Sequence, residues 1–416
     1  MQIIKFGGAS IKDSVNIKNV TEIIKKQNYL DSIIIVSAIG KTTNKLELIV
    51  KNYVENNKDL QNSLLDLEKF HIKITNDLFP KNHKIHSAIN LYFKEIASFL
   101  KNNKSPNYNF IYDQIIPFGE LLSSCILNEY LNLCGINSKL KDVRNLIKTD
   151  SYYRNSNVNW ALTQKIISNT KFINSITLTQ GFIASNEDNF TTTMGREASD
   201  YTASIFAYCL NAKSVTIWKD VDGVLNSDPR YFKKPVLIKK MSYDEAIELA
   251  FYGASVIHPK TIQPLQKKEI PLFVRSYINP EITGTCISHS TELNPIVPCY
   301  ILKKNQILIS ISSLDFSFTI NDNTIYILNL IKEHKIKINL TQNSAISLTF
   351  CIEDEYNNFD KLLNKLKSNF KIATSKNVNL YTIRNIEKDT MRKFKKDKSV
   401  LIEQIFHNTA QYVVIN

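Results

Sequence analysis

The alternation of strand-like and helix-like stretches from residue 1 to about residue 280 constrains the fold of this chain most strongly. Residues 33–36 (Ile-Ile-Ile-Val) and 215–218 (Val-Thr-Ile-Trp) are short apolar runs, typical of strands buried on both faces of a parallel sheet. Residues 15–24 have helical spacing, and residues 46–104 are expected to form paired helices. This order favours an α/β fold with a mainly parallel sheet and helices on both of its faces.

The first expected strand, residues 2–6, carries Lys5 and runs into Gly7 and Gly8, with Ser10 close behind. Glycines let a backbone approach an anion closely, and Lys5 adds positive charge. Because a helix-like stretch follows, the segment predicts a turn that binds phosphate. A Gly-Gly pair alone is weak evidence, and the lysine two residues before it sharpens the prediction.

The loop after residues 33–36 offers further candidate contacts. Residues 40–42 (Gly-Lys-Thr) match the end of a Walker A loop, but Ile35 occupies the place of its first glycine, so we exclude that motif. The hydroxyls of Ser37 and Thr43 remain candidate substrate contacts, because open α/β sheets bind ligands at the carboxyl ends of their strands.

Residues 195–202 place Arg196, Ser199 and Asp200 just before an apolar, helix-like run. The start of a helix suits an anion, because free backbone N–H groups and the positive helix end point outward there. Arg196 can hold a substrate carboxylate with two hydrogen bonds. The alternative is a capped surface helix, in which Ser199 or Asp200 serves as the N-cap.

Acidic and basic side chains at two other expected element ends extend the candidate site. Glu120 stands at a helix start, where it either offsets the helix dipole or holds a substrate ammonium group. Residues 215–218 run into Lys219 and Asp220, with Arg230 further on, which is a candidate edge for a nucleotide site. Lys219 could equally be a solvated surface lysine.

Composition excludes several other classes. The net charge is +13, but the lysines are spread along the chain, so we expect no nucleic-acid partner. Six scattered cysteines without a Cys-x-x-Cys pair indicate free thiols in a reducing compartment, and His83 and His86 lack a second ligand pair for a metal. We find no signal peptide and no apolar run of roughly 18 residues, so we expect a cytoplasmic protein without a membrane partner.

Six motifs, taken in order, resemble those of the aspartate kinases (aspartokinases) in the amino-acid kinase family. The resemblance covers residues 1 to about 288. It implies a three-layer αβα kinase domain followed by ACT-type regulatory modules. It also implies transfer of the ATP γ-phosphoryl group to the side-chain carboxylate of L-aspartate, with Mg²⁺ bound chiefly through the phosphates. The motifs are residues 5–10 (KFGGAS), 37–44 (SAIGKTTN), 118–120 (FGE), 191–202 (TTTMGREASDYT), 218–230 (WKDVDGVLNSDPR) and 253–260 (GASVIHPK).

The resemblance implies a role for each matched residue. Lys5 would stabilise the transferring phosphoryl group, and Asp200 would orient Lys5 and the phosphates. Arg196 would bind the α-carboxylate of aspartate and Glu120 its ammonium group. The aspartate pocket would be lined by Ser37, Thr43 and Ser199. The expected ATP contacts are Gly7, Gly8, Ser10, Lys219, Asp220, Arg230 and Lys260. No strong general base is needed, because the nucleophilic carboxylate is already ionised and catalysis depends on positioning and charge neutralisation.

Several positions depart from the residues usual in the family. Ser255 bears most on ATP, because a nucleotide-contacting lysine is common there. Lys260, five residues on, is the candidate to replace it, and without such a replacement ATP affinity should fall. The other departures are Ala9 and Lys219 where threonine is usual, Glu197 and Ala198 in place of Gly-Gly, and Leu225 where an aromatic is often found.

The C-terminal part is expected to form a separate α+β domain. Polar residues 286–298 are a predicted linker, so that residues 1–288 form the catalytic domain and residues 299–416 an ACT-like regulatory domain, with a second ACT module abbreviated. The resemblance implies a homodimer through this region. Lysine-sensitive relatives carry a Ser-Val-Asp-like triplet where residues 337–339 (Lys-Ile-Asn) stand, which argues against lysine feedback. The expected strands are residues 306–311, 336–340, 345–351 and 411–415, and the expected helices are residues 324–333 and 359–368.

The leading hypothesis is therefore a transferase that makes 4-phospho-L-aspartate, the first step toward lysine and diaminopimelate, threonine and methionine. Two alternatives stay open at this point. One is another carboxylate kinase of the same family, which the motifs around Glu120 and Asp200 disfavour. The other is a catalytically weakened, ligand-binding regulator on the same scaffold, for which Ser255 is the best support.

Overall fold

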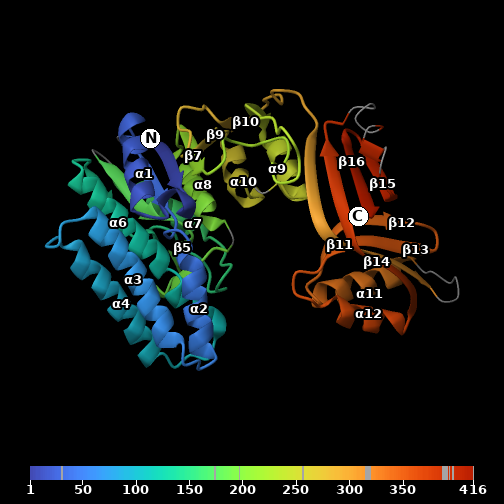
Figure 1. Ribbon diagram of the computed structural model, residues 1–416, viewed down its shortest axis with the longest axis horizontal. Helices are drawn as coiled ribbons and strands as arrows, with labels where there is room; N and C mark the ends of the chain where they lie inside the picture. Colours follow the sequence, from blue (N-terminus) through green and yellow to red (C-terminus); the bar gives the residue numbers. More distant parts are fainter. Residues whose placement is uncertain are drawn as a thin grey trace. The chain divides into compact units, whose positions relative to one another are not determined.

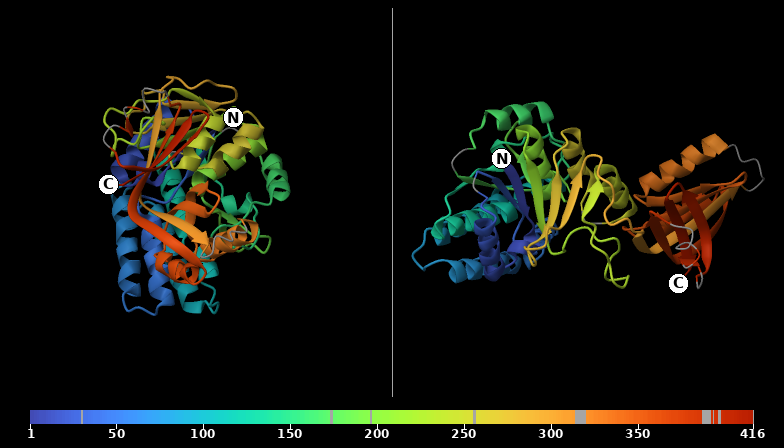
Figure 2. Two further views of the ribbon diagram at one scale, coloured as in Figure 1. Left: turned by 90° about the vertical axis from the view of Figure 1, so that its right-hand side faces the viewer. Right: turned by 90° about the horizontal axis from the view of Figure 1, so that it is seen from above.

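The computed structural model of the chain consists of two compact units (Figures 1 and 2). The structure describes residues 1–29, 31–172, 175–195, 197–254, 257–313, 320–386, 392, 394–395 and 398–415. The N-terminal unit comprises Met1–Val224, Leu237–Ile247 and Val256–Pro295. The C-terminal unit comprises Leu225–Val236, Glu248–Ser255 and Ile296–Asn416.

The N-terminal unit is built on an eight-stranded sheet with the order β3-β4-β2-β1-β7-β9-β10-β8. Its strand pairs are parallel except for β9 with β10. Strand β2 is buried along its whole length, as expected for a strand covered on both faces. The predicted mainly parallel sheet is therefore confirmed. The strands are β1 (Gln2–Phe6), β2 (Ile33–Val36), β3 (Ser138–Leu140), β4 (Ile176–Gln180), β7 (Ser214–Lys219), β8 (Lys240–Ser242), β9 (Leu272–Ser276) and β10 (Thr285–Ser288).

Helices lie on both sides of this sheet, as the right-hand view of Figure 2 shows. Helix α8 packs on β1 and β7, and α6 packs on β3 and β4. The paired helices predicted for residues 46–104 are present as α2, α3 and α4 (Figure 1). The helices are α1 (Ser14–Lys26), α2 (Thr42–Val54), α3 (Leu60–Leu78), α4 (Ile85–Asn102), α5 (Tyr108–Ile115), α6 (Phe118–Leu133), α7 (Trp160–Asn169), α8 (Ala198–Leu210), α9 (Tyr243–Tyr252) and α10 (Pro259–Lys267). Short 3₁₀ turns (Gly8–Ile11 and Val143–Asn145) and the hairpin of β5 (Ile183–Ser185) with β6 (Thr191–Thr193) complete the unit.

One helical stretch among the described residues, Tyr108–Leu133, is long and apolar enough to cross a membrane by length and composition alone. It spans α5 and α6, and 78% of its most apolar window is buried inside the structure. Burial of this kind is what the core helix of a soluble protein shows, since apolar helix faces pack against the rest of the core.

The C-terminal unit contains a six-stranded antiparallel sheet with the order β12-β13-β11-β14-β16-β15. The first four strands and two helices follow one another as strand, helix, strand, strand, helix, strand, which is the ferredoxin-like arrangement of an ACT module. Strands β15 and β16 then extend the same sheet. The elements are β11 (Cys299–Ser313), α11 (Ile320–Glu333), β12 (Lys337–Asn343), β13 (Ser347–Glu353), α12 (Phe359–Lys367), β14 (Phe370–Arg384), β15 (Val400–Phe406) and β16 (Thr409–Ile415).

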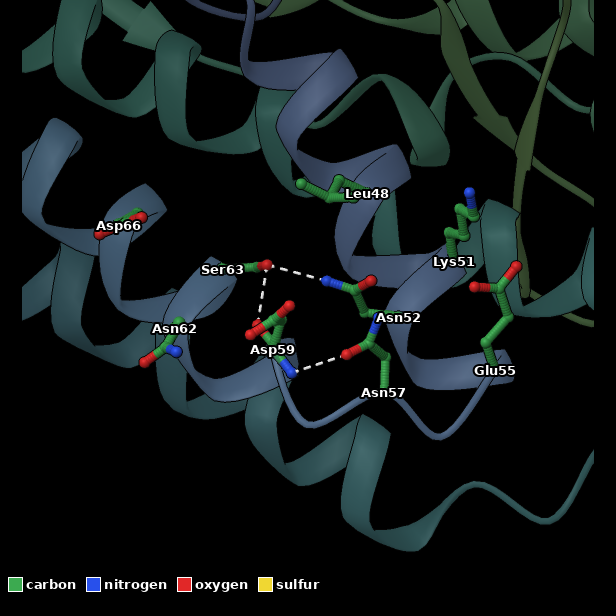
Figure 3. Close-up of a pocket in the computed structure, with 9 residues that line it drawn as sticks. All are labelled: Leu48, Lys51, Asn52, Glu55, Asn57, Asp59, Asn62, Ser63 and Asp66. Atoms are coloured by element: carbon green, nitrogen blue, oxygen red, sulfur yellow. Dashed lines mark hydrogen bonds between the residues drawn. The ribbon is translucent and has the colours of Figure 1, made fainter.

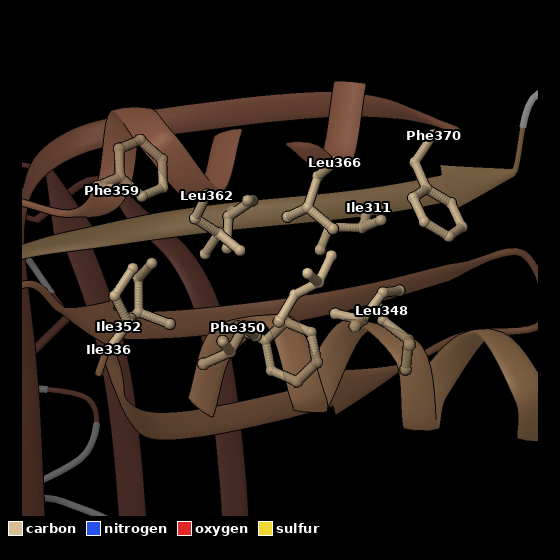
Figure 4. Packing of buried hydrophobic residues seen from close by; sticks show 13 residues of the cluster. Ile311, Ile336, Leu348, Phe350, Ile352, Phe359, Leu362, Leu366 and Phe370 are labelled. Atoms are coloured by element: carbon tan, nitrogen blue, oxygen red, sulfur yellow. The ribbon is translucent and has the colours of Figure 1, made fainter. Parts of the chain in front are cut away.

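The core of the C-terminal unit lies between its two helices and one face of the sheet (Figure 4). Leu362 and Leu366 of α12 are fully buried there beside Ile311 of β11 and Phe350 of β13. Leu362 and Leu366 stand four residues apart, so they project from the same helix face. Burying each such side chain contributes about 1.5–3 kcal/mol, which makes this cluster the main stabilising element of the unit.

Each strand and helix predicted from the sequence after residue 299 is present, which confirms the α+β, ACT-like fold class of this region. Two earlier segments, Leu225–Val236 and Glu248–Ser255, also belong to the C-terminal unit. The predicted domain limits at residues 288 and 299 stay a prediction.

Candidate active site

A buried cluster of two lysines and one aspartate lies where β1, β7 and α8 meet. The Lys5 Nζ is 2.6 Å from Asp200 Oδ1, and the Lys219 Nζ is 3.2 Å from Asp200 Oδ2. Lys5 lies near the carboxyl end of β1 and Lys219 ends β7, while Asp200 lies in the first turn of α8. The structure therefore brings together the two residues to which the sequence assigned catalysis, and it adds Lys219 to them.

The opposite charges of the lysines and the aspartate stabilise one another in the interior. Only 3% of the Asp200 side chain and 9% of the Lys5 side chain are exposed. Burial alone would raise the pKa of Asp200, but the neighbouring ammonium groups of Lys5 and Lys219 outweigh it and lower that pKa below its ordinary value. Asp200 is therefore ionised at neutral pH, and the three side chains together carry a net charge of about +1.

The glycine turn after β1 lies against the loop after β2. The Gly40 N–H donates to the Gly8 carbonyl at 3.0 Å, and a Cβ built on Gly8 would lie 2.6 Å from the Ala38 carbonyl oxygen. Only a residue without a side chain allows this approach. Gly7 lies beside the Lys5 ammonium, since a Cβ there would be 3.4 Å from its Nζ. The Ser10 hydroxyl is fully buried and donates to the Gly7 carbonyl at 2.6 Å, so it holds the turn in shape.

Glu120 is buried in the first turn of α6 with half of its carboxyl group unsatisfied. Its Oε1 accepts the Ala38 N–H at 3.2 Å, while its Oε2 has no hydrogen-bond partner among the described residues. Burial raises the pKa of Glu120 to about 8, against the lowering effect of the Ala38 hydrogen bond. A buried carboxyl oxygen without a partner is costly unless a ligand completes it. This geometry favours an ammonium ligand over a helix-dipole role.

The hydroxyl residues predicted to line a substrate pocket lie around the same strand ends. Ser37 follows β2, is half-buried, and donates its N–H to the Phe6 carbonyl at 3.3 Å. Ser199 is buried in the first turn of α8, and a Cβ on Gly181 would come within 2.6 Å of its Cβ. Thr43 is half-buried in the first turn of α2. Arg196, predicted to bind a carboxylate, lies outside the described residues.

The residue before α8 has an unusual backbone conformation. Glu197, the N-cap, has a φ of 57° in the left-handed region, and its side chain makes no capping hydrogen bond. This region is rarely adopted by residues with a side chain and favours glycine. The family's usual glycine at this place therefore has a conformational reason, and the chain keeps the conformation with a glutamate.

The remaining predicted ATP contacts lie on other elements. Asp220 is exposed immediately after β7. The Lys260 Nζ donates to Asn155 Oδ1 at 3.0 Å in the N-terminal unit, and that oxygen would lie 2.5 Å from a Cβ on Gly195. Arg230 belongs to the C-terminal unit, where its Nη2 lies 2.6 Å from Asp228 Oδ2. Ser255 lies outside the described residues.

Three residues that position predicted site residues were not themselves predicted from the sequence. The Ala38 amide holds Glu120, Gly181 admits Ser199, and Asn155 holds Lys260. Gly181 had a local signal, because an isolated glycine directly after a buried strand often marks a close backbone approach. The Ala38 amide and Asn155 had none, because their roles depend on packing between distant segments.

A surface pocket elsewhere in the N-terminal unit does not suit a nucleotide (Figure 3). It has a volume of about 430 Å³ and lies where α2 leads into α3. Its rim carries three carboxylates, Glu55, Asp59 and Asp66, and one lysine, Lys51, so its charge would repel phosphate groups. We therefore place the candidate site at the lysine–aspartate cluster.

The fold and this cluster define an open α/β protein with two lysines and an aspartate at its strand ends, and the comparisons with known proteins identify its family. Residues 1–276 match the sequence model of the amino acid kinase family, and the chain belongs to that family. The predicted fold class is confirmed by solved structures that share its fold. The structure of E. coli aspartokinase III in complex with lysine and aspartate superposes with a TM-score of 0.86 at 23% identity, covering 100% of this chain and 96% of that one. The aspartate kinase of Clostridium acetobutylicum gives 0.82 at 23% identity, with the same coverage of both chains.

Sequence relatives point to the same group. A bifunctional aspartokinase/homoserine dehydrogenase of Buchnera aphidicola is 35% identical over 298 residues, covering 69% of this chain and 36% of that protein. The chloroplastic aspartokinase 1 of Arabidopsis thaliana is 28% identical over 364 residues, covering 84% of this chain and 63% of that protein. The chain thus spans less than two thirds of the length of these relatives.

Proposed function

We propose that this chain is an aspartate kinase, ATP:L-aspartate 4-phosphotransferase. It would transfer the γ-phosphoryl group of ATP to the side-chain carboxylate of L-aspartate and form 4-phospho-L-aspartate. The observation that carries the proposal is the buried Lys5–Asp200–Lys219 cluster at the strand ends of an amino acid kinase fold. The printed names of the relatives support the choice of substrate, and one E. coli neighbour was solved with aspartate and ADP.

The chemistry that the cluster supports is charge neutralisation. An aspartate carboxylate oxygen would attack the γ-phosphorus, and the bond between that phosphorus and the bridging oxygen would break, with ADP leaving. Lys5, held by Asp200 at 2.6 Å, would stabilise the negative charge on the transferring group. The turn at Gly7 and Gly8 would let the phosphates approach the backbone. Because the substrate carboxylate is already ionised, the site needs no base to activate it.

The proposed aspartate pocket would use residues around the carboxyl end of β2. The substrate ammonium group would donate a hydrogen bond to Glu120 Oε2, which has no partner among the described residues. Arg196 would bind the α-carboxylate, and the hydroxyls of Ser37, Thr43 and Ser199 would line the pocket. The pocket would then recognise the two carboxylates and the one ammonium group of the substrate by their charges. This pattern fits an amino acid with an acidic side chain and would reject a nucleotide monophosphate.

ATP would be bound by the glycine turn with Ser10, and by Lys219, Asp220, Arg230 and Lys260. Mg²⁺ would arrive with ATP, neutralise its phosphates and be held mainly by them. Within the described residues, no group of three or more histidines, cysteines, aspartates or glutamates is arranged to hold a metal ion. Asp200 could contribute little as a ligand, because each of its oxygens already faces a lysine.

We also propose a domain organisation and a biological role for this chain. Residues 1–288 would be the catalytic domain and residues 299–416 the regulatory domain, with β15 and β16 as the remainder of an abbreviated second ACT module. The enzyme would be a cytoplasmic homodimer through the ACT-like region, without nucleic-acid or membrane partners. Its product would open the route to lysine and diaminopimelate, threonine and methionine.

A coupled assay with ATP, Mg²⁺ and candidate substrates tests the proposal. We expect ADP formation with L-aspartate and at least tenfold less with L-glutamate or UMP. Turnover of glutamate or UMP without turnover of aspartate would contradict it in favour of another carboxylate or nucleotide kinase. ATP binding by calorimetry without phosphate transfer would instead support the ligand-binding regulator. The Lys5→Met variant serves as the inactive control in each assay.

A further inference from the structure

The geometry points to Asp113 as a positioning residue for the proposed reaction. It fixes the hairpin of β5 and β6 relative to the helix that carries Glu120, and it thereby sets the shape of the aspartate pocket. The inference rests on the proposed kinase function and deepens it, because it names a residue that determines how well the amino-acid substrate binds. Asp113 lies in α5, outside the six motifs on which the resemblance rests.

Asp113 is a fully buried carboxyl group that accepts three hydrogen bonds from two separate segments. Its Oδ1 accepts the Thr193 hydroxyl at 2.8 Å, and its Oδ2 accepts the Thr193 N–H at 2.9 Å and the Arg154 N–H at 3.0 Å. Burial raises the pKa of Asp113 to about 6, although these hydrogen bonds favour the ionised form. The group is therefore ionised at neutral pH, and hydrogen bonds to an ionised acceptor are stronger than those between neutral groups.

The hairpin of β5 and β6 needs such an anchor, because two short strands are marginally stable by themselves. Thr193 ends β6, and its backbone N–H donates to Asp113 while its carbonyl accepts the Ser156 N–H at 2.9 Å. Gln114, the next residue of α5, donates from its Nε2 to the Thr191 carbonyl at 2.9 Å. Two consecutive residues of α5 therefore hold the two ends of β6.

The anchored strand is connected to the first turns of α8. The N–H of the residue after Thr193 donates to the Phe182 carbonyl at 3.1 Å, and the Phe182 N–H donates to the Thr202 hydroxyl at 3.1 Å. Gly181 packs against Ser199, since a Cβ on this glycine would lie 2.6 Å from the Ser199 Cβ. A displacement of Thr193 would therefore move the backbone against which Ser199, a predicted pocket residue, is packed.

The other side of the proposed pocket is connected to Asp113 through the helices themselves. Asp113 precedes Glu120 by seven residues, and the two residues between α5 and α6 also have helical backbone angles. A continuous helical backbone transmits position over such a short distance, because its hydrogen bonds follow one another without a break. Asp113 thus couples the carboxyl group proposed to bind the substrate ammonium group to the hairpin that packs beside α8.

Removing this carboxyl group should weaken the binding of aspartate more than that of ATP. In Asp113→Ala we expect KM for aspartate to rise at least tenfold and KM for ATP to change less than threefold, because the proposed phosphate contacts at the ends of β1 and β7 do not depend on the hairpin. Asp113→Asn should keep KM for aspartate within threefold of the wild type. Its amide oxygen can accept both N–H groups, and its amide N–H can donate to the Thr193 hydroxyl oxygen.

Asp150 provides the matched control within the segment that also contains Arg154. Its exposed side chain accepts the backbone N–H groups of Tyr152 and Asn157, both at 3.1 Å, so Asp150→Ala likewise removes a carboxylate that holds backbone amides. We expect KM for aspartate within twofold of the wild type in this variant. An equal rise in Asp150→Ala and Asp113→Ala would attribute the effect to loosening of residues 150–157 and would overturn the inference.

A second variant keeps the test open should Asp113→Ala fail to fold. Thr193→Val removes only the hydroxyl donor and should raise KM for aspartate about threefold to tenfold, and Thr193→Ser should restore it. A folded Asp113→Ala or Thr193→Val protein with KM for aspartate within twofold of the wild type overturns the inference. If the wild type does not phosphorylate aspartate, the proposed function fails. Faster amide hydrogen exchange of residues 191–195 in Asp113→Ala would then still support the anchoring role, and unchanged exchange would contradict it.

Discussion

Each unit of this protein has a lysine beside polar side chains on a sheet, buried in the N-terminal unit and half-buried in the C-terminal unit, and the two clusters differ in the partners of that lysine. In the N-terminal unit, Lys5 and Lys219 both form ion pairs with the ionised carboxylate of Asp200. In the C-terminal unit, the Lys303 Nζ donates to Asn339 Oδ1 at 2.8 Å, and the Asn339 Nδ2 donates to Gln306 Oε1 at 2.6 Å. The first cluster is built around a charge and the second around an amide.

The difference indicates which cluster is available to a ligand. The Asn339 Nδ2 also donates to Glu353 Oε2 at 3.3 Å, so both polar ends of that amide are satisfied by the protein. Burial, together with the like charge of Lys337, lowers the pKa of Lys303. A hydrogen-bonded network of this kind contributes to stability and specificity. A cluster of two lysines and one carboxylate at the strand ends is instead suited to an anionic ligand. Asn339 stands where lysine-sensitive relatives carry a carboxylate, and its amide is already occupied.

The largest expected effect follows from removing the charge at the centre of the N-terminal cluster. In Asp200→Asn, Lys5 and Lys219 lose their counter-ion and their orientation. We expect kcat with aspartate to fall about 10³-fold and the free energy of unfolding to fall by about 3–5 kcal/mol, as for breaking a buried ion pair. Steady-state kinetics and urea unfolding measure both. Asp66→Asn, at an exposed aspartate, is the control, and an active Asp200→Asn enzyme would remove the basis of the proposed function.

A smaller effect on activity is expected from Glu120→Gln, which keeps the shape of the side chain but not its charge. Loss of attraction for the substrate ammonium group should lower kcat/KM for aspartate about 10- to 100-fold, chiefly through KM. Because the pKa of Glu120 is raised to about 8, the wild-type carboxyl is mostly neutral at pH 7 and ionises as the pH rises. KM for aspartate should therefore fall roughly fivefold to tenfold between pH 7 and 8.5, and the glutamine variant should not show this fall.

The same substitution, Glu120→Gln, should raise the stability of the protein at high pH although it lowers the activity. A carboxyl group whose pKa is raised in the folded state stabilises the fold at low pH, and that contribution is lost as the pH rises through about 8. Above pH 8 the wild type buries a charge that Glu120→Gln does not carry. We therefore expect the less active variant to melt at the higher temperature there. A wild type with no change of melting temperature between pH 7 and 9 would show that Glu120 is already ionised.

The sequence was sufficient to predict that Lys5 and Asp200 belong to one site, but not to predict what surrounds them. Lys5 and Asp200 stand at the ends of strongly patterned elements, so motif and periodicity together located both. Gly181 and Asn155 were missed, because their roles arise where distant loops pack together. The grouping of Arg230 with the C-terminal unit likewise depends on tertiary contacts that no local pattern records.

In the C-terminal sheet, too, the sequence predicted some strands and not others. The largely apolar β13 and β16 were predicted, whereas β14 and β15 were not. Five of the seven β15 side chains are exposed, and the first half of β14 is largely polar, so neither offers a regular apolar period. These strands form because neighbouring strands already satisfy one edge of their backbone hydrogen bonds.

The hydrogen-bond network of Lys303, Asn339 and Gln306 in the C-terminal unit should affect stability and not turnover. Lys303→Met leaves the Asn339 carbonyl oxygen without its donor, so we expect the free energy of unfolding to fall by about 1–3 kcal/mol, with kcat and KM within twofold of the wild type. The neighbouring Lys337→Met removes an exposed charge that repels Lys303 and should change stability by less than about 0.5 kcal/mol. A loss of kcat in Lys303→Met would contradict the contrast between the two clusters.

The smallest effect is expected at the residue that leads into α8. Glu197 adopts a φ of 57°, which costs a residue with a Cβ about 1–2 kcal/mol, whereas glycine adopts it freely but loses more backbone entropy on folding. We expect Glu197→Gly to raise the free energy of unfolding by about 0.5–1 kcal/mol. Glu197→Ala keeps the strain and removes the charge, so it should give no such gain. Both variants should bind ATP slightly more tightly, because a negative charge near the phosphates is gone. If alanine stabilises as much as glycine, the charge of Glu197 and not its backbone conformation is the unfavourable feature, and the preference for glycine at this helix start would have an electrostatic cause.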